Sequence, residues 1–176
     1  MGNDPLIGNE STNTSVLRPY GVWLVISPFN FPFALSGGPM GAALVTGNTV
    51  VLKPATDTPW VVRLLVDCFR DAGLPDGVVN FVTGPGRTLG QALLDSPEVD
   101  GVTFTGSFDV GMKMYRDFAG GKYVRPIILE LGGKNPVIVM YDASIDLAVE
   151  MVLRGAMRST GQKCTATSSG FVQKGI

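Results

Sequence analysis

Two side chains carry reactive groups in settings that differ from an ordinary core. Cys164 follows the segment Gly-Gln-Lys and precedes Thr-Ala-Thr, so small and polar residues surround its thiol. Glu130 interrupts the apolar segment 127–131 and precedes two glycines and Lys134. A thiolate is a nucleophile, and a carboxylate among apolar neighbours can act as a general base unless a cation neutralises it. We therefore expect a nucleophile at Cys164 and, at Glu130, either a general base or a salt bridge to Lys134 or Arg125.

The absence of histidine narrows the chemistry further. With none in 176 residues, serine–histidine–aspartate triads, histidine-bound zinc and histidine-ligated haem are excluded within this chain. Any thiolate must be stabilised by Lys163, Lys134 or backbone N–H groups instead. The second cysteine, Cys68, shares a helical face with Leu64 and Leu65, which predicts an inert core thiol. Two cysteines are too few for a disulfide framework or a thiolate cage, so we expect no metal site and a reducing, cytoplasmic location.

Polar residues follow two of the apolar segments. Asn30 lies in Ser-Pro-Phe-Asn-Phe-Pro, directly after the segment 22–27, and Lys53 ends the segment 49–53. An asparagine in a turn either forms the turn itself or donates its amide to the oxyanion of a reaction intermediate. A lysine at a strand end either extends to solvent or donates to a polar ligand. The residues alone leave both pairs of alternatives open.

Two glycine-rich segments also lie between an apolar and a helical segment. The run 84–90, Gly-Pro-Gly-Arg-Thr-Leu-Gly, is one residue too long for the G-x-G-x-x-G dinucleotide fingerprint, so a tight turn explains it as well as a pyrophosphate does. The segment Phe-Thr-Gly-Ser ends at Ser107, where the start of a helix offers free backbone N–H groups to a phosphate. An ordinary helix cap is the alternative there.

The elements that must position these residues alternate along the chain. Segments rich in Val, Ile and Phe predict strands at 22–27, 49–53, 78–82, 101–105, 127–131 and 136–140. Segments with helical spacing lie between them, at 33–45, 59–72, 86–94, 108–118 and 145–158. This alternation predicts an α/β fold, with an open, mostly parallel Rossmann-like sheet and helices on both faces. Residues just after the strands then gather at one edge, where such sheets bind ligands.

The composition fits a domain with a real core. Hydrophobic residues make up 45% and charged residues 16%, with a net charge of -1, which argues against disorder and against a nucleic-acid-binding surface. Residues 19–52 contain no charge, but Pro28, Pro32 and Pro39 interrupt them. Because prolines break a helix and leave backbone groups unpaired in lipid, we expect no membrane span.

Five segments together resemble the NAD(P)-dependent aldehyde dehydrogenase superfamily. They are Ser-Pro-Phe-Asn-Phe-Pro at 27–32, Gly-Asn-Thr-Val-Val-Leu-Lys-Pro-Ala at 47–55, Phe-Thr-Gly-Ser at 104–107 with Gly111, Leu-Glu-Leu-Gly-Gly-Lys-Asn-Pro at 129–136 and Gly-Gln-Lys-Cys at 161–164. No single segment is specific to this family. The order and spacing of all five across residues 18–172 are specific to it. The segments around Asn30 and Ser107 look closest to Δ1-pyrroline-5-carboxylate (glutamate semialdehyde) dehydrogenases, enzymes of proline catabolism.

The resemblance implies that an aldehyde is oxidised to a carboxylic acid through a thiolate mechanism. Cys164 would attack the aldehyde carbon, and the oxyanion would be held by the Asn30 amide and the Cys164 backbone N–H. Hydride then passes to a nicotinamide, and Glu130 activates the water that hydrolyses the thioester. The expected partner is a small-molecule aldehyde, in particular glutamate semialdehyde, with no nucleic acid or membrane.

For the cofactor, the resemblance implies NAD and leaves NADP open, because Thr56 stands where NAD-preferring relatives often carry a glutamate. Lys53 corresponds to the lysine that binds the adenine-ribose hydroxyls, and Gly106 and Ser107 to the residues that approach the pyrophosphate. The remaining positions expected at the cofactor site are Ser27, Phe29, Gly86, Val110, Leu131 and Gly132.

The chain divides into three parts, the first indicated by its polar sequence without periodicity and the other two implied by the resemblance. A polar leader spans 1–18, a dinucleotide-binding domain 19–141, and the beginning of a catalytic domain 142–176. A whole family member is much longer, so we expect a fragment, inactive alone, of a homo-oligomeric parent. One alternative is a nucleotide-binding module without catalytic duty. Another, a cysteine-dependent acyl-transfer enzyme without nicotinamide, would leave Lys53 without a role.

Overall fold

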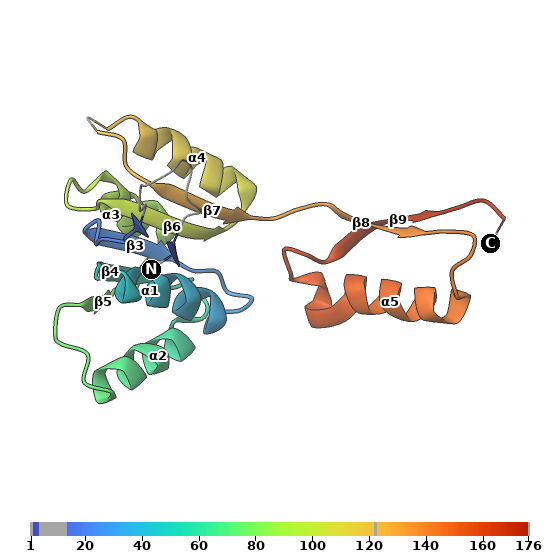
Figure 1. Ribbon diagram of the computed structural model, residues 1–176, viewed down its shortest axis with the longest axis horizontal. Coiled ribbons are helices and arrows are strands. Elements are labelled where there is room, and N and C mark those ends of the chain that lie inside the picture. Colours follow the sequence, from blue (N-terminus) through green and yellow to red (C-terminus); the bar gives the residue numbers. More distant parts are fainter. Residues whose placement is uncertain (1, 4–13, 122, 176) are drawn as a thin grey trace.

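The computed structural model describes residues 2–3, 14–121 and 123–175 (Figure 1). Its main feature is a parallel sheet in the order β5-β4-β3-β6-β7, which confirms the predicted α/β class. The strands are β3 (Val22–Ile26), β4 (Thr49–Lys53), β5 (Val79–Phe81), β6 (Gly101–Gly106) and β7 (Ile127–Leu131). Because the strand order reverses between β3 and β6, their carboxyl ends form the switch point at which such sheets bind ligands.

Helices cover both faces of this sheet (Figure 1). They are α1 (Ala34–Val45), α2 (Pro59–Asp71), the π turn η1 (Gly86–Gly90) continued by α3 (Gln91–Asp95), and α4 (Phe108–Ala119). Pro59 opens α2, where its missing N–H costs nothing, and Gly73, with a φ of 88°, follows the end of that helix.

Alternating strand residues supply two cores, one on each face of the sheet. The core under α3 and α4 contains Leu24, Leu94, Val99, Val102, Phe104, Met114 and Phe118. The core under α1 and α2 contains Val25, Met40, Ala43, Val50, Leu52, Val62 and Leu65. At about 25 cal/mol per Å² of apolar surface removed from water, these clusters are the main stabilising term of the unit. They therefore hold the strand ends, and the loops that follow them, in fixed positions.

The remaining elements form a βαβ unit beside this sheet. β8 (Asn135–Val139) runs parallel to β9 (Thr167–Val172), and α5 (Ile145–Met157) with the 3₁₀ turn η2 (Arg158–Gly161) connects them. The sequence places its sixth strand, 136–140, with the others, whereas β8 pairs with β9. Figure 1 shows the chain leaving the main sheet after β7 to reach this unit. The domain boundary at residue 141 stays a prediction.

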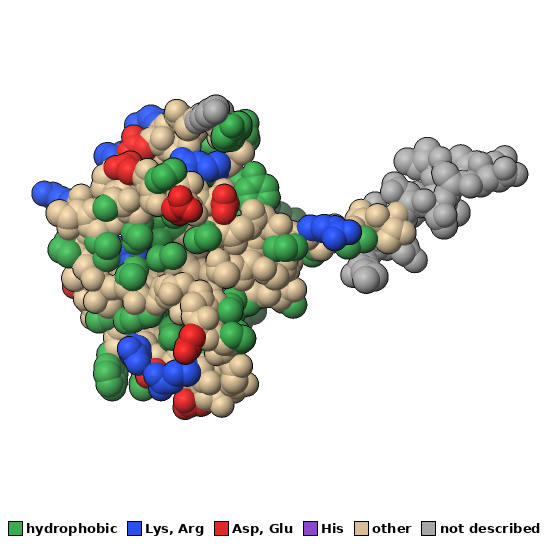
Figure 2. All heavy atoms as spheres, turned by 90° about the vertical axis from the view of Figure 1, so that its left-hand side faces the viewer, with side chains coloured by type: hydrophobic (Ala, Val, Ile, Leu, Met, Phe, Trp, Pro, Cys, Tyr) green, Lys and Arg blue, Asp and Glu red, His purple; other side chains and the backbone are tan. Residues whose placement is uncertain are grey.

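The N-terminal segment is described only in part. Of the predicted leader, 1–18, residues 1 and 4–13 lie outside the described residues, and β1 (Gly2–Asn3) pairs antiparallel with β2 (Thr14–Ser15). Within the described ranges, no helix has both the length and the apolar character needed to cross a membrane. Figure 2 looks at the edge where the strands begin, and side chains of both charges gather there at the levels of α2 and α4, with hydrophobic ones between. On that face, the two signs are interspersed.

Candidate nucleotide pocket and nucleophile loop

Lys53 ends β4 with its ammonium group inside the molecule. Only 4% of the residue is exposed, and its Nζ donates a hydrogen bond of 3.2 Å to the carbonyl oxygen of Pro54. No carboxylate of the described residues forms an ion pair with it. Burial lowers the pKa of Lys53 below its ordinary 10.5, because the charged form loses its hydration. Lys53 therefore does not extend to solvent, and it keeps two N–H donors for a ligand.

A cavity of about 390 Å³ lies next to Lys53, at the switch point of the sheet. It is bounded by the ends of β3, β4 and β6 and by η1, α3 and α4. Its lining residues are Ile26, Lys53, Gly86, Arg87, Gly90, Gln91, Leu94, Phe104, Val110, Lys113 and Met114. Three of the predicted cofactor residues, Lys53, Gly86 and Val110, thus meet in one lining. A Cβ at Gly86 would meet no atom within 4 Å, so the wall is open at that glycine.

The start of α4 offers further donors near this cavity. Ser107 precedes the helix in an extended conformation, and its hydroxyl forms no capping hydrogen bond. The N–H groups of the first turn therefore have no side-chain cap and can bind an anion. Gly106 has a different explanation, because a Cβ there would lie 2.5 Å from the Phe104 ring. Close packing, rather than room for a ligand, accounts for the glycine at this position.

The other predicted cofactor residues lie outside the cavity lining. Ser27 is buried, and its hydroxyl accepts a hydrogen bond of 2.6 Å from Ser36 of α1, on the opposite face of the sheet. Phe29, Thr56 and Gly132 are exposed on the loops after β3, β4 and β7. Leu131 packs against the core under α4. Contacts of these residues with a cofactor stay predictions.

Cys164 lies on the exposed loop between η2 and β9. Asn135 fixes the backbone of that loop, since its Nδ2 donates hydrogen bonds of 2.7 Å to the carbonyl oxygen of Cys164 and 3.2 Å to that of Ala166. Just before the thiol, Ser159 and Thr160 both have a φ of 55°, a left-handed conformation that is costly without glycine. Such strain persists where the surrounding structure imposes it, often at functional turns.

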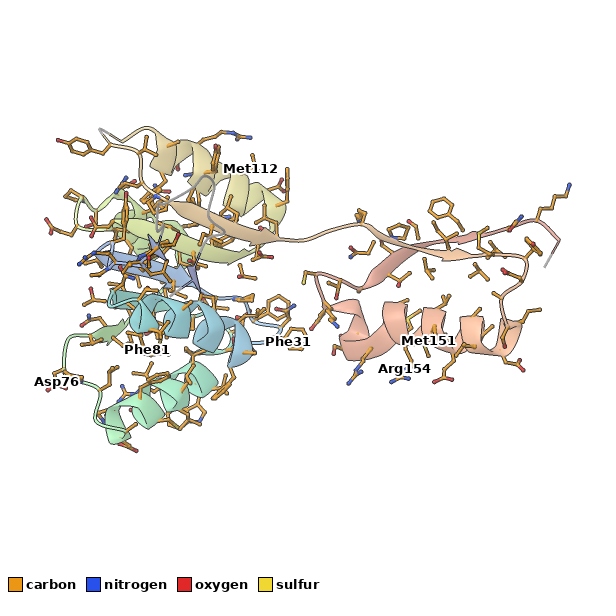
Figure 3. The ribbon with its side chains drawn as sticks, viewed as in Figure 1. Phe31, Asp76, Phe81, Met112, Met151 and Arg154 are labelled. Carbon is orange, nitrogen blue, oxygen red and sulfur yellow. The ribbon has the colours of Figure 1, made fainter. Side chains whose placement is uncertain are left out.

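Asn30 connects the main sheet to the loop that bears Cys164. Its Nδ2 donates a hydrogen bond of 2.8 Å to the carbonyl oxygen of Gln162, which lies shortly before Cys164 in the chain. Phe31, on the same loop, lies on the side of the sheet that faces the βαβ unit (Figure 3). The Asn30 Oδ1 is buried and accepts no hydrogen bond from the described residues. The amide therefore does not close its own turn, and it keeps one N–H donor beside the loop that bears Cys164.

Glu130 is exposed on β7, so the predicted burial among apolar neighbours is wrong. β7 is an edge strand, and α1, which contacts β3 and β4, leaves the face that carries Glu130 largely uncovered. Among the described residues, neither Lys134 nor Arg125 forms an ion pair with it. Arg125 instead donates to the carbonyl oxygen of Val99 and stacks on the Phe118 ring.

Cys68 is also exposed, which corrects the prediction of a core thiol. The buried face of α2 is formed by Val62 and Leu65, with Phe69 packed against the same core. Leu64 and Cys68 lie one turn apart beside that face, and both are exposed. The prediction was wrong because Leu64 and Cys68 do not belong to the buried face that Leu65 shares with Val62.

Comparison with known proteins identifies the family. The model of the aldehyde dehydrogenase family matches residues 3–176. The chain belongs to the aldehyde dehydrogenase family. The segments that carry Asn30, Lys53, Glu130 and Cys164 all lie within this match.

Relatives in this family differ in the substrate that they are named for. The chain is 55% identical over 161 residues to the alpha-ketoglutaric semialdehyde dehydrogenase of Bacillus subtilis (strain 168), covering 90% of this chain and 32% of that protein. It is 46% identical over 179 residues to 1-pyrroline-5-carboxylate dehydrogenase 1 of Halalkalibacterium halodurans, covering 99% and 35%. The NAD+ complex of an aldehyde dehydrogenase from Bacillus cereus superposes with a TM-score of 0.88 at 40% identity, covering 98% and 35%. The chain thus spans about a third of the length of these aldehyde dehydrogenases.

Three polar residues of the cavity lining were not predicted. They are Arg87, Gln91 and Lys113. Arg87 lies inside the glycine-rich run 84–90, so a signal for it existed in the sequence. Gln91 and Lys113 occupy positions on helices where spacing alone does not separate a pocket from solvent.

Proposed function

We propose that this chain is the cofactor-binding part and the nucleophile loop of an NAD(P)-dependent aldehyde dehydrogenase. The observation that carries the proposal is the hydrogen bond from Asn30 to Gln162. It joins the loop after β3, a strand whose end lines the cavity, to the loop that bears Cys164. An amide donor, a nucleophile and a cavity that contains a buried ammonium are thereby connected at one edge of the sheet.

The residues around the cavity fit a nicotinamide dinucleotide. Lys53 has two free donors for ribose hydroxyls, and the uncapped first turn of α4 has N–H groups for a pyrophosphate. The open wall at Gly86 and the apolar side chains of Val110 and Met114 suit a flat ring. When bound, the dinucleotide supplies the acceptor for the hydride that leaves the substrate carbon.

Cys164 begins the proposed reaction. Its thiolate sulfur forms a bond to the aldehyde carbon, and the carbonyl oxygen becomes an oxyanion. The free N–H of the Asn30 amide and the backbone N–H of Cys164 donate to this oxyanion, and loss of one such donor typically costs about 2.7 to 4 kcal/mol of transition-state stabilisation. Departure of the hydride from the same carbon restores the carbonyl group and leaves a thioester on the sulfur.

Glu130 completes the cycle in this proposal. Its carboxylate, exposed on β7, takes a proton from a water molecule as the water oxygen attacks the thioester carbon. The carbon–sulfur bond breaks, which releases a carboxylic acid and returns the thiolate. The loop after β7 supports this assignment, since Asn135, just beyond it, binds the backbone of Cys164.

We propose glutamate semialdehyde as the substrate, with alpha-ketoglutaric semialdehyde as the competing choice. Both are five-carbon acids with a terminal aldehyde, and they differ in whether the carbon next to the carboxylate carries an amino or a keto group. The ratio of the two kcat/KM values, measured with the complete gene product, decides between them. A ratio above one for glutamate semialdehyde supports the first choice.

The nucleophile assignment is tested in the complete gene product by following the absorbance of reduced nicotinamide after addition of aldehyde and dinucleotide. Cys164→Ser is expected to lower turnover at least about 1,000-fold while dinucleotide binding stays unchanged. Cys68→Ser, the matched control on exposed α2, is expected to leave turnover within about twofold. Turnover retained in the Cys164 variant would falsify the assignment.

A second candidate is a nucleotide-binding module with no catalytic duty. It is favoured by the location of both apolar cores and the cavity within the five-stranded unit. Calorimetric titration of the 176-residue chain with NAD and NADP tests it. Micromolar binding together with no turnover in the complete gene product would select this candidate over the enzyme.

A further inference from the structure

The charged side chains that line the cavity are all of one sign. Lys53, Arg87 and Lys113 line it, and no aspartate or glutamate does. Lys113 is already engaged, because its Nζ donates to Gln91 Oε1 at 2.9 Å and pairs with the carboxylate of Asp117. The other two cations have no acidic partner among the described residues. Two uncompensated positive charges therefore border the same space.

Arg87 lines the cavity from η1. It is the second residue of η1, its side chain is exposed, and it makes no side-chain hydrogen bond or ion pair within the described part of the chain. Gly90 ends the same turn, and a Cβ there would lie 3.8 Å from Cε of Lys53. The lysine stem thus packs directly against η1. Arg87 and Lys53 consequently reach the cavity from two adjacent elements.

The chemistry of dinucleotide recognition indicates which ligand group Arg87 and Lys53 are suited to bind. Sites for NAD use a carboxylate to accept hydrogen bonds from the ribose 2′-hydroxyl, whereas sites for NADP place an arginine near the 2′-phosphate. The lining has an arginine and no carboxylate, and the loop after β4 carries neutral Thr56. A phosphate brings about −1.5 to −2 charges, and the guanidinium fork binds two of its oxygens at once.

We propose that Arg87, with Lys53, makes this cavity select NADP over NAD by binding the 2′-phosphate. The inference rests on the proposed dinucleotide function of the cavity. Arg87 is a specificity-determining residue in this account, because NAD offers no phosphate at the 2′ position and gains little from it.

Calorimetric titration of the 176-residue chain with NADP and with NAD tests the proposal. NADP is expected to bind at least about tenfold more tightly, a difference of about 1.4 kcal/mol. Arg87→Ala is expected to remove that advantage and to leave NAD affinity within about twofold. Arg87→Lys, which keeps the charge but not the fork, is expected to retain an intermediate preference. Arg116→Ala, an exposed arginine of α4 outside the lining, is the matched control and is expected to change neither affinity.

The outcomes separate the two proposals. Equal or tighter binding of NAD, or an NADP preference that survives in Arg87→Ala, overturns the role of Arg87 and leaves dinucleotide binding intact. Absence of binding for both dinucleotides overturns the proposed function of the cavity as well. Circular dichroism of each variant confirms that its helices remain folded, which is expected because Arg87 makes no contact that holds the fold.

Discussion

The five-stranded unit and the β8-α5-β9 unit both connect parallel strands through a βαβ crossover. They differ in how much of their apolar side chains they bury. In the first, helices on both faces enclose two apolar cores. In the second, α5 has no buried residue, and Val139 is the residue of β8 and β9 that reaches burial, at 8% exposure. Apolar side chains such as Ile138, Phe171 and Val172 remain more than half exposed.

The difference shows that an apolar pattern indicates which face of a segment can be buried. It does not indicate which other element packs against that face. One helix covers one face of two strands, and a two-stranded sheet leaves its second face and both edges open. The five-stranded unit has two helical layers and can stabilise the cavity at its edge. The loop that bears Cys164 belongs to the unit with little core of its own, so its position depends on the hydrogen bonds from Asn30 and Asn135.

The largest expected effect on stability comes from replacing one phenylalanine by alanine in each unit. Phe118→Ala empties a ring that is 1% exposed, and we expect a loss of about 3 to 5 kcal/mol in the free energy of unfolding. Phe171→Ala removes a ring that is 60% exposed, with an expected loss below about 0.5 kcal/mol. Urea denaturation of the chain measures both, and similar losses for the two would break the contrast.

A smaller effect of opposite sign is expected at Lys53. Lys53→Met keeps the apolar stem and removes a buried, unpaired charge, so we expect unfolding free energy to rise by about 1 kcal/mol at neutral pH while dinucleotide binding is lost. The pKa of Lys53 is lowered in the folded state, so the unfolded chain binds more protons between that pKa and 10.5. The stability of the unsubstituted chain therefore rises across that pH range. Thermal melts should show the gap to Lys53→Met narrowing with rising pH, and a constant gap would count against an unpaired buried charge.

The smallest effect concerns the exposed ion pairs, which occur in both units. Arg154, on the side of α5 away from the strands (Figure 3), pairs with Glu150 at 3.4 Å. Arg154→Ala is expected to cost less than about 0.5 kcal/mol. Arg63→Ala, whose partner is Asp67 on α2, is expected to leave the denaturation midpoint almost unchanged, because that pair is in contact with solvent. Urea denaturation checks both, and a loss above about 1 kcal/mol at Arg154 would mean that α5 is better anchored than its exposure suggests.

The elements of the five-stranded unit were predicted from the sequence because their apolar periodicity and their glycine and proline signals are local, whereas β9, which begins with the small and polar residues 167–170, was not predicted. Lys53 and Gly86 were expected at one edge because parallel strands end together, and both line the same cavity. The exposure of Glu130 was missed because strand order, which makes β7 an edge, depends on long-range pairing that no local pattern encodes. Arg87 is the one charged side chain in the run 84–90, but the glycine pattern there does not indicate whether that side chain faces a cavity or solvent.

Amide hydrogen exchange of the 176-residue chain, measured with and without saturating NADP, tests the central claim that the cavity of the five-stranded unit is a dinucleotide site. The account predicts added protection at the end of β4, over η1 and in the first turn of α4, with no change across β8, α5 and β9. Protection gained only in the β8-α5-β9 unit, or nowhere, would contradict it.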